Sequence, residues 1–261
     1  MAPIFDCYIG IDYSGARIPI SGLKGLRVYQ ADRTSPPFEV LPSSGPSRYW
    51  SRCGVAKWLL NQLSQDRQTI VGIDHGFSFP LRYFETHSLP LNWVTFLDDF
   101  RIHWPTDGNQ ISVNSVRDGT YGNGTARRGD SHWKRRVEIK TGRAKSVFHF
   151  DVPGSVAKST HAGLPWLRYL RGELGSRVLF WPFDGWDIPR GPSAIVEVYP
   201  ALWNKSFPNE NRTGDQHDAY SIAAWMHNAD RDGILSEYLK LDLPPEDSRV
   251  AQIEGWILGI K

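Results

Sequence analysis

The sequence predicts an α/β fold with a mixed central sheet, in which an antiparallel meander and parallel strands are flanked by helices. Residues 9–12 (IGID) and 71–74 (VGID) are two similar apolar runs, each as short as a buried strand. Further strand-like runs follow the first one through short connections with Gly, Pro or Ser at their ends, which is typical of an antiparallel meander. A helical pattern precedes the second run, so the two runs can be parallel neighbours joined by a right-handed crossover.

The first third of the chain contains three strand-like runs and one helical pattern. The runs are short, apolar and bounded by Gly, Pro or Ser, and they are residues 8–12, 26–30 and 38–41. From Trp50 to Gln65, apolar residues recur three and four positions apart, which predicts a helix with one packing face. Ser47 or Ser51 can cap the start of this helix.

Residues 81–175 are less regular, and we expect them to form a large insertion on a single domain that spans residues 1–261. Residues 91–103 and 164–174 have helical patterns, whereas residues 118–125 (DGTYGNGT) have the composition of a flexible loop. A basic segment follows this loop. The length and irregularity of the stretch favour an insertion over a separate domain.

The regular pattern resumes in the last third of the chain. The expected strands and helices are residues 178–183, 194–199, 215–228 and 234–239, followed by a strand-like piece at residues 253–260. Pro200 stops the second of these strands. The helix at 215–228 places Ala219, Ile222 and Ala223 on its packing side.

Length and composition are those of an ordinary globular protein. The chain has 261 residues, of which 40% are hydrophobic and 22% are charged, so it can bury a core without disulfides. Cys7 and Cys53 form no CxxC pair, which disfavours a structural zinc site. Residues 1–6 lack the pattern of a secretory signal, and no stretch has the ~20 apolar residues of a membrane span. We therefore expect a cytoplasmic protein that does not enter a membrane.

Several carboxylates follow or end the predicted strands and helices. Asp12 and Asp74 end the two similar strands, and parallel strands place their C-terminal ends at one sheet edge, where open α/β sheets bind ligands. Asp215 and Asp218 are three residues apart and share one helical face. Glu197 is a further candidate, although it can also face solvent. A single Asp after a strand is often a turn or cap residue, so only the combination predicts a catalytic group.

Carboxylates at close range repel each other, so such a group requires a cation or a shared proton. Oxygen ligands without Cys suit Mg²⁺ or Mn²⁺, and the expected metal ligands are Asp12, Asp74 and Asp218. Two such ions roughly 4 Å apart can activate water and stabilise the leaving oxygen in phosphodiester hydrolysis. The sequence therefore predicts a metal-dependent hydrolase of the nuclease type, whose partner is nucleic acid.

The order of these pieces resembles the ribonuclease H-like superfamily, which includes the Holliday-junction resolvases. More closely, the chain is similar to a domain-of-unknown-function family of predicted ribonuclease H-like nucleases. The matching pieces are Gly10-Ile11-Asp12, Gly72-Ile73-Asp74 with Pro80, Glu197-Val198-Tyr199-Pro200, Asp215-Gln216-His217-Asp218-Ala219 with Ala223-Ala224, and Glu254-Gly255-Trp256-Ile257. The resemblance implies a ribonuclease H-like fold with nuclease activity, and it leaves much of residues 81–175 unmatched. Asp74 stands where resolvases commonly have Glu, which shortens this ligand by one methylene.

Two other functions fit the same pattern. An actin-like phosphotransferase that uses ATP shares this core, and residues 10–15 (GIDYSG) resemble a phosphate-binding turn. Those enzymes usually duplicate the domain, however, and this chain shows no second phosphate loop. The other alternative is a catalytically silent module that binds nucleic acid and loses nothing when Asp12 is changed. Calorimetry with ATP separates the first alternative from a nuclease, and an Asp12 variant separates the second.

Residues 127–145 form a basic segment in a chain whose net charge is only +2. Eight Lys and Arg residues stand there against Asp130 and Glu138. Such a stripe is either a solvated surface or a surface that binds anions. We expect a mobile arm that closes over the phosphate backbone beside the acidic site, with an aromatic ring that stacks on an unpaired base. The expected nucleic-acid contacts are Arg127, Arg128, Trp133, Lys134, Arg135 and Arg136.

Overall fold

A mixed six-stranded sheet forms the centre of the computed structural model, which describes residues 3–43 and 47–261. The strands are β1 (Cys7–Tyr13), β2 (Leu26–Asp32), β3 (Phe38–Glu39), β4 (Thr69–Ile73), β5 (Val178–Trp181) and β6 (Ser193–Glu197). Their order is β3-β2-β1-β4-β6-β5; β2 pairs antiparallel with β1 and β3, and the other pairs are parallel. The predicted α/β class with a mixed sheet is therefore confirmed. Residues 1–2, part of the stretch without a secretory pattern, lie outside the described residues.

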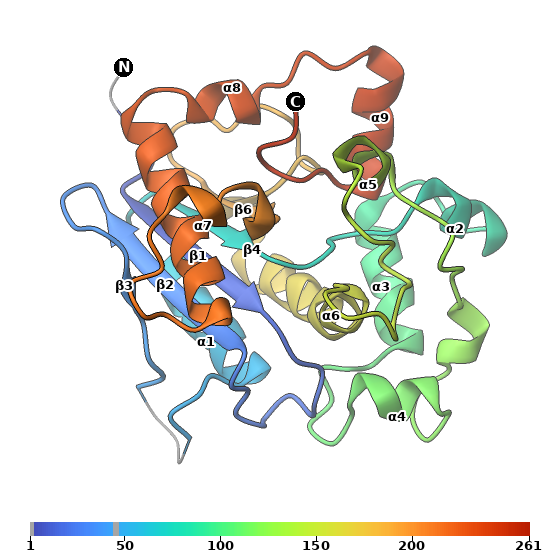
Figure 1. Cartoon of the computed structure of the whole chain (residues 1–261). Coiled ribbons are helices and arrows are strands. Elements are labelled where there is room, and N and C mark those ends of the chain that lie inside the picture. The colour runs from blue at the N-terminus through green and yellow to red at the C-terminus, as the bar shows by residue number, and fades with distance from the viewer. Residues whose placement is uncertain (1–2, 44–46) are drawn as a thin grey trace.

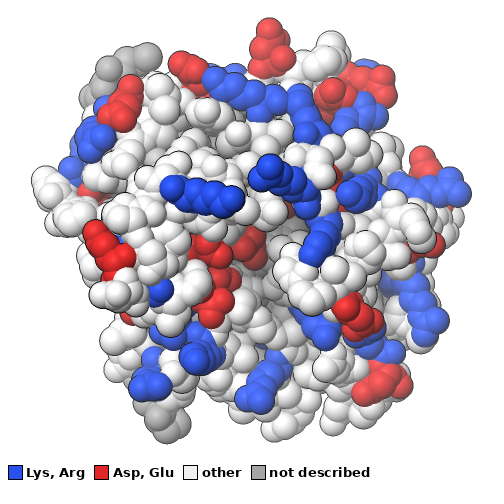
Figure 2. Space-filling view, viewed as in Figure 1, with Lys and Arg blue, Asp and Glu red and all other residues white. Residues whose placement is uncertain are grey.

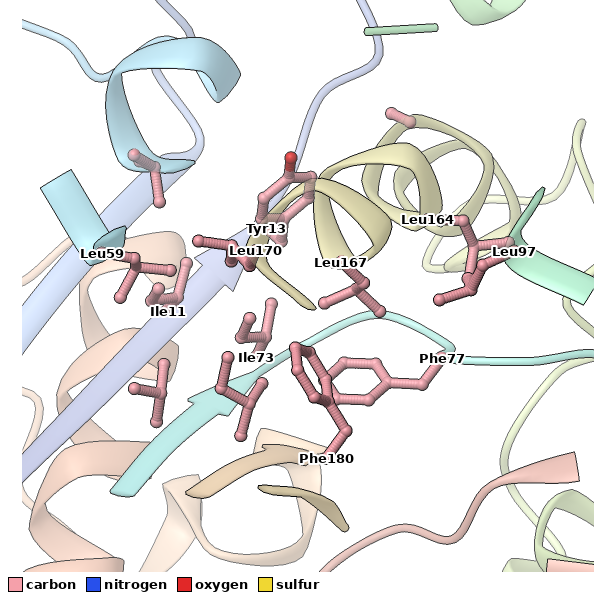
Figure 3. Packing of buried hydrophobic residues seen from close by; sticks show 14 of the residues in the cluster. Ile11, Tyr13, Leu59, Ile73, Phe77, Leu97, Leu164, Leu167, Leu170 and Phe180 are labelled. Carbon is pink, nitrogen blue, oxygen red and sulfur yellow. The ribbon is translucent and has the colours of Figure 1, made fainter. Parts of the chain in front are cut away.

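Helices cover both faces of the sheet (Figure 1). The long helices are α1 (Arg52–Leu63), α3 (Trp93–His103), α6 (Ala157–Leu174) and α7 (Gly214–Arg231). On the face covered by α1 and α6, Figure 3 shows Ile11 of β1 and Ile73 of β4 packed beside Leu167 of α6. On the other face, Val196 of β6 packs in a second cluster with Ile222 of α7. Because side chains alternate along a strand, each strand contributes to both hydrophobic cores.

Residues 81–175 form the right-hand part of the molecule in Figure 1 and share a core with the sheet. Besides α3 and α6, they contain α2 (Leu81–Thr86), α4 (Val113–Arg117), the 3₁₀ turn η1 (Gly124–Arg127) and α5 (Arg136–Thr141). Phe96, Phe100 and Val116 belong to the same hydrophobic cluster as the residues of β1 and β4. The helices predicted at residues 91–103 and 164–174 are confirmed, although the second begins earlier, at Ala157.

The strand-like piece predicted at residues 253–260 is wrong. The helix α9 (Pro245–Glu254) extends into it, and Gly255, with φ 82°, ends that helix. Pro245 and Glu246 are helix-start signals that outweigh the apolar pattern downstream. This piece meets the sheet through a single parallel bridge between Ile257 and Glu197, where the Leu258 amide donates a hydrogen bond to the Glu197 carbonyl at 2.9 Å. The short helix predicted before it is present as α8 (Leu235–Leu239).

Three of the long helices, α1, α3 and α7, begin at residues whose side chains cap them. Ser51 caps α1, because its side chain accepts a hydrogen bond from the Gly54 amide at 3.0 Å. Thr213 caps α7 in the same way through the Gln216 amide. None of the helices in residues 3–43 and 47–261 is long and apolar enough to cross a membrane.

Candidate active site

Asp12 and Asp74 lie side by side at the C-terminal ends of two parallel strands. Ile11 of β1 is paired with Ile73 of β4, so the two aspartates occupy the next position in register. The Asp74 amide donates a hydrogen bond to the Ile11 carbonyl at 3.0 Å, which continues the ladder one residue beyond β4. The rigid sheet thus fixes both backbones where the sequence predicts a shared edge.

Two glycines allow α7 to lie directly on this part of the sheet. A Cβ atom on Gly10 would stand 2.3 Å from the Ala219 carbonyl oxygen, and one on Gly72 would stand 2.7 Å from Cγ2 of Ile222. Any larger side chain at either position would therefore push the helix away. Gly10 and Asp12 are two residues apart, as are Gly72 and Asp74, so both carboxylates project from the face that α7 covers.

The first turn of α7 brings two more carboxylates to this edge. Asp215 and Asp218 precede Ala219 and Ile222 by four residues, so they continue the packing stripe of the helix by one turn. One oxygen of Asp218 accepts a hydrogen bond from the Asn204 side-chain amide at 2.9 Å. The structure therefore brings the four predicted aspartates together.

The position of Asn204 is fixed in turn by α7. The Nε2 atom of His217 donates a hydrogen bond to the backbone oxygen of Asn204 at 2.8 Å. His217, Asn204 and Asp218 thus form a chain of contacts that orients one carboxylate. The sequence gives no sign of this role for Asn204, since it lies in a short 3₁₀ turn, η4 (Asn204–Ser206), outside every predicted element.

The four carboxylates perturb one another. Burial raises the pKa of Asp12 well above its ordinary value, and the charges of Asp74, Asp215 and Asp218 raise it further. Burial also raises the pKa of Asp74 from 3.8 to about 8, and the charges of Asp218 and Glu197 add to this effect. Burial and mutual repulsion thus disfavour the charged forms of Asp12 and Asp74.

Cations stand at the rim of the acidic group rather than within it. Burial raises the pKa of Asp215, whereas the charges of Arg27 and Lys24 lower it. The Nη1 atom of Arg27 donates to Glu39 at 2.9 Å, so its strongest partner lies outside the group. Figure 2 shows Asp and Glu side chains gathered near the middle of this face beside a hollow, with Lys and Arg side chains around them.

The donor set fits a hard divalent cation. Asp12, Asp74 and Asp218 provide carboxylate oxygens without any Cys, which suits Mg²⁺ or Mn²⁺. Their mutual repulsion, visible in the raised pKa values of Asp12 and Asp74, is what a cation would relieve. As placed, no three His, Cys, Asp or Glu side chains within residues 3–43 and 47–261 converge closely enough to hold one ion. Binding would therefore require the Asp12 and Asp74 side chains to turn toward Asp218, whose carboxylate Asn204 holds in place.

Glu197 does not join the four aspartates, contrary to its predicted role as a catalytic carboxylate. Val196 on β6 and Val198 just beyond its end face α7, so Glu197 between them projects from the opposite side of the strand. Its oxygens accept hydrogen bonds from Arg135 Nη1 and Nη2 at 2.7 and 2.5 Å, and from the Phe77 amide at 2.9 Å. Glu197 is thus occupied by partners within the protein.

The basic segment is folded onto the core and is not a free arm. Arg135 is 1% exposed, so the prediction that it contacts nucleic acid is wrong. Arg136 pairs with Asp247, and Arg127 forms two hydrogen bonds with Asp99, at 2.6 and 2.7 Å. These pairs neutralise charge that was expected to meet phosphate.

The other residues that were expected to contact nucleic acid, Trp133, Arg128 and Lys134, differ in how exposed they are. Trp133 is half-buried and packs its ring against Phe148, with ring centroids 6.2 Å apart, so stacking on a base would compete with this contact. Arg128 and Lys134 are exposed, and Lys134 donates to the Ala144 carbonyl at 3.2 Å. Of the six predicted residues, Arg128 and Lys134 present their charge to solvent most openly.

Comparison of the chain with protein-family models, with characterised proteins and with solved structures gave no match. The class of site is therefore defined by its own geometry. It is a group of four mutually repelling aspartates, one buried and three partly exposed, at the C-terminal edge of a mixed α/β sheet, beside the first turn of a helix.

Proposed function

We propose that the chain is a ribonuclease H-like nuclease that hydrolyses phosphodiester bonds in nucleic acid with Mg²⁺ or Mn²⁺. Asp12, Asp74 and Asp218 would hold the metal, and Asp215 would assist. One observation supports this most strongly: Asp12 and Asp74 occupy adjacent register positions at the ends of two parallel strands, on the face of the sheet that α7 and its acidic first turn cover.

The topology supports the ribonuclease H-like part of the proposal. A three-stranded antiparallel meander, a helix and a parallel strand follow one another from β1 to β4, and β6 lies next to β4. The helix α7, which carries Asp215 and Asp218, comes after all the strands and crosses β1 and β2. This is the order of elements that the sequence resemblance implies. The strand β5 lies beyond β6 at the sheet edge.

The residues of the site divide the chemical work. A bound divalent metal would supply an activated water near neutral pH and offset charge on the phosphoryl oxygens. Asp12 and Asp74, which lie at the ends of rigid strands, would hold the metal ion in a fixed position. Asp218 would be a third ligand, and Asn204 holds its carboxylate in place. Asp215 is half-exposed with a raised pKa, which suits a carboxylate that accepts a proton at the rim of the site.

A cleavage assay tests the proposal. Single-stranded, duplex, hybrid and branched substrates are incubated with Mg²⁺ or Mn²⁺, and we expect the wild type to cleave at least one of them. Asp12→Asn and Asp218→Asn should each abolish cleavage without loss of folding, whereas Asp66→Asn, at an exposed carboxylate away from the site, should leave it unchanged. Cleavage of no substrate, or equal cleavage by Asp12→Asn, would contradict the proposal and favour a silent binding module. ATP binding by calorimetry would favour a phosphotransferase.

A further inference from the structure

The far end of the basic segment, residues 142–145, lies at the acidic site. This loop follows α5, which ends at Gly142 with φ 66°. The Ala144 amide donates to Oγ1 of Thr141 at 3.2 Å, and Lys134 donates to the Ala144 carbonyl. Lys145 donates to the Pro153 carbonyl. These contacts give the loop a defined conformation, in which two cations, Arg143 and Lys145, flank Ala144.

A cavity of about 30 Å³ lies between this loop and Asp74, one of the candidate metal ligands. Asp74 lines one side of it, and Lys145 and Ala144 line another, together with Tyr199. Lys145 therefore borders the same small space as Asp74. Neither Arg127 nor Arg128, at the other end of the basic segment, borders this cavity; both line a different one beside Trp104.

Two further residues near this cavity, Tyr199 and Arg143, can contact an anion beside Asp74. Tyr199 follows β6 and is half-buried beside the acidic site. Its phenol lies within electrostatic reach of both Asp74 and Arg143, since burial and then Asp74 raise the pKa of Tyr199, and Arg143 lowers it. Arg143 is exposed, and it forms no ion pair among residues 3–43 and 47–261. Its charge is thus available to an anion that approaches Asp74.

A buried network holds α5, and thereby this loop, against the sheet. Arg135, one residue before α5, forms ion pairs with Glu197 of β6 and with Glu138 of α5 itself. These pairs fix α5 next to β6, which is itself the neighbour of β4, the strand that delivers Asp74. An acidic site repels a polyanion, so a fixed pair of cations at its edge provides the attraction that the carboxylates lack.

We propose that Arg143, Lys145 and Tyr199 form the phosphate-binding edge of the site, where they contact the backbone of a nucleic-acid strand whose reacting phosphate lies at Asp74. The two cations attract the phosphates on either side, and the Tyr199 hydroxyl donates a hydrogen bond to a phosphate oxygen. This assignment rests on the proposed nuclease function and identifies the part of the protein that meets the substrate.

Fluorescence anisotropy with a labelled single strand, measured across a salt series in Ca²⁺, tests the assignment. Each lost phosphate contact should flatten the slope of log affinity against log salt by about 0.7 for a single strand. We expect Arg143→Ala to weaken binding with this change of slope, and Tyr199→Phe to weaken binding without it, since Tyr199 is neutral. Arg128→Ala is the matched control, because Arg128 is an exposed cation of the same segment that lines another cavity.

The possible results separate this inference from the proposed function. If Arg143→Ala and Tyr199→Phe both bind as the wild type does, the edge is elsewhere and the inference fails, even where Asp12→Asn still abolishes cleavage. The same holds if Arg128→Ala is the variant that loses affinity and slope. A wild type that binds no nucleic acid at all overturns both the edge and the nuclease. Lys145→Gln combined with Arg143→Ala should double the change of slope, to about 1.4.

Discussion

Arg135 and Glu197 form a buried, two-armed ion pair that joins the basic segment to the sheet. Nη1 and Nη2 of Arg135 contact the two oxygens of Glu197 at 2.7 and 2.5 Å, and Nε contacts Glu138 at 2.8 Å. All three side chains are buried. Two residues that the sequence predicts to have separate functions, one in nucleic-acid binding and one in catalysis, thus serve together to fix α5 beside β6.

Replacing Arg135 should therefore affect folding directly. Arg135→Ala leaves Glu197 and Glu138 buried without their partner, and we expect the free energy of unfolding in urea to fall by about 3–5 kcal/mol. Arg136→Ala is the control, because its carboxylate partners are partly exposed and such pairs contribute about 1 kcal/mol or less. Equal losses of unfolding free energy in the two variants would show that the buried ion pair contributes no more to stability than the exposed one.

Gly10 should tolerate no side chain. In Gly10→Ala the new Cβ would stand 2.3 Å from the Ala219 carbonyl oxygen and 2.6 Å from the Ala223 amide nitrogen, so α7 must shift. We expect the free energy of unfolding to fall by about 1–3 kcal/mol. Gly172→Ala, inside α6 with open space around it, should instead raise this free energy by about 0.5–1 kcal/mol. A neutral Gly10→Ala would refute the close contact between α7 and β1.

Stability without metal should decrease as pH rises. Folded Asp74 keeps its proton up to about pH 8, whereas in the unfolded chain it is lost near the ordinary value of 3.8. A raised pKa in the folded state adds stability that is complete at low pH and is lost as pH rises through about 8. Urea unfolding in EDTA should show this decline in the wild type and a smaller one in Asp74→Asn.

Added Mn²⁺ should reverse that trend. Metal binding requires deprotonated carboxylates and releases protons, so the affinity for Mn²⁺ should increase with pH up to about 8. Thermal unfolding with and without Mn²⁺ at several pH values measures the difference. Stabilisation by Mn²⁺ that is the same at every pH would mean that Asp12 and Asp74 do not bind the ion.

Asn204 should influence metal binding without contacting the metal. Asn204→Ala removes the hydrogen bond to Asp218 Oδ1, which frees that carboxylate to rotate. Loss of such a partner typically costs 10–100-fold in metal affinity, and we expect a loss of about 10-fold for Mn²⁺. Asn204→Ser, which keeps a short donor, should recover part of it. An unchanged affinity in Asn204→Ala, with folding intact, would remove Asn204 from the site.

The sequence predicts most of the sheet because its signals are local. Residues 9–12 lie within β1, and residues 71–74 cover the end of β4 and the residue after it. Residues 26–30 lie within β2, and residues 38–41 begin with β3 and extend just past it. The sequence also predicts that the four aspartates lie together. Parallel strands place Asp12 and Asp74 at one sheet edge, and a spacing of three residues places Asp215 and Asp218 on one helical face. The last predicted strand failed because the end of α9 is set by Gly255 and not by apolar pattern.

The errors in the site arise from contacts between residues far apart in the chain. Glu197 lies one residue out of phase with Val196 and Val198, and the direction of its side chain follows only from the pairing of β6 with β4. Arg135 is 62 residues from Glu197, and Arg136 is 111 residues from Asp247. No local pattern shows that these charges are paired, so a basic segment is indistinguishable from a free surface until the fold is known.

Calorimetric titration with Mn²⁺ tests the central claim most directly, because the proposed function requires that Asp12, Asp74 and Asp218 bind a metal ion together. We expect the wild type and the control Asp66→Asn to bind Mn²⁺ with release of protons, and Asp12→Asn, with the same fold by circular dichroism, to bind it far more weakly. Equal binding by Asp12→Asn and wild type would contradict the assignment of this edge as a metal centre.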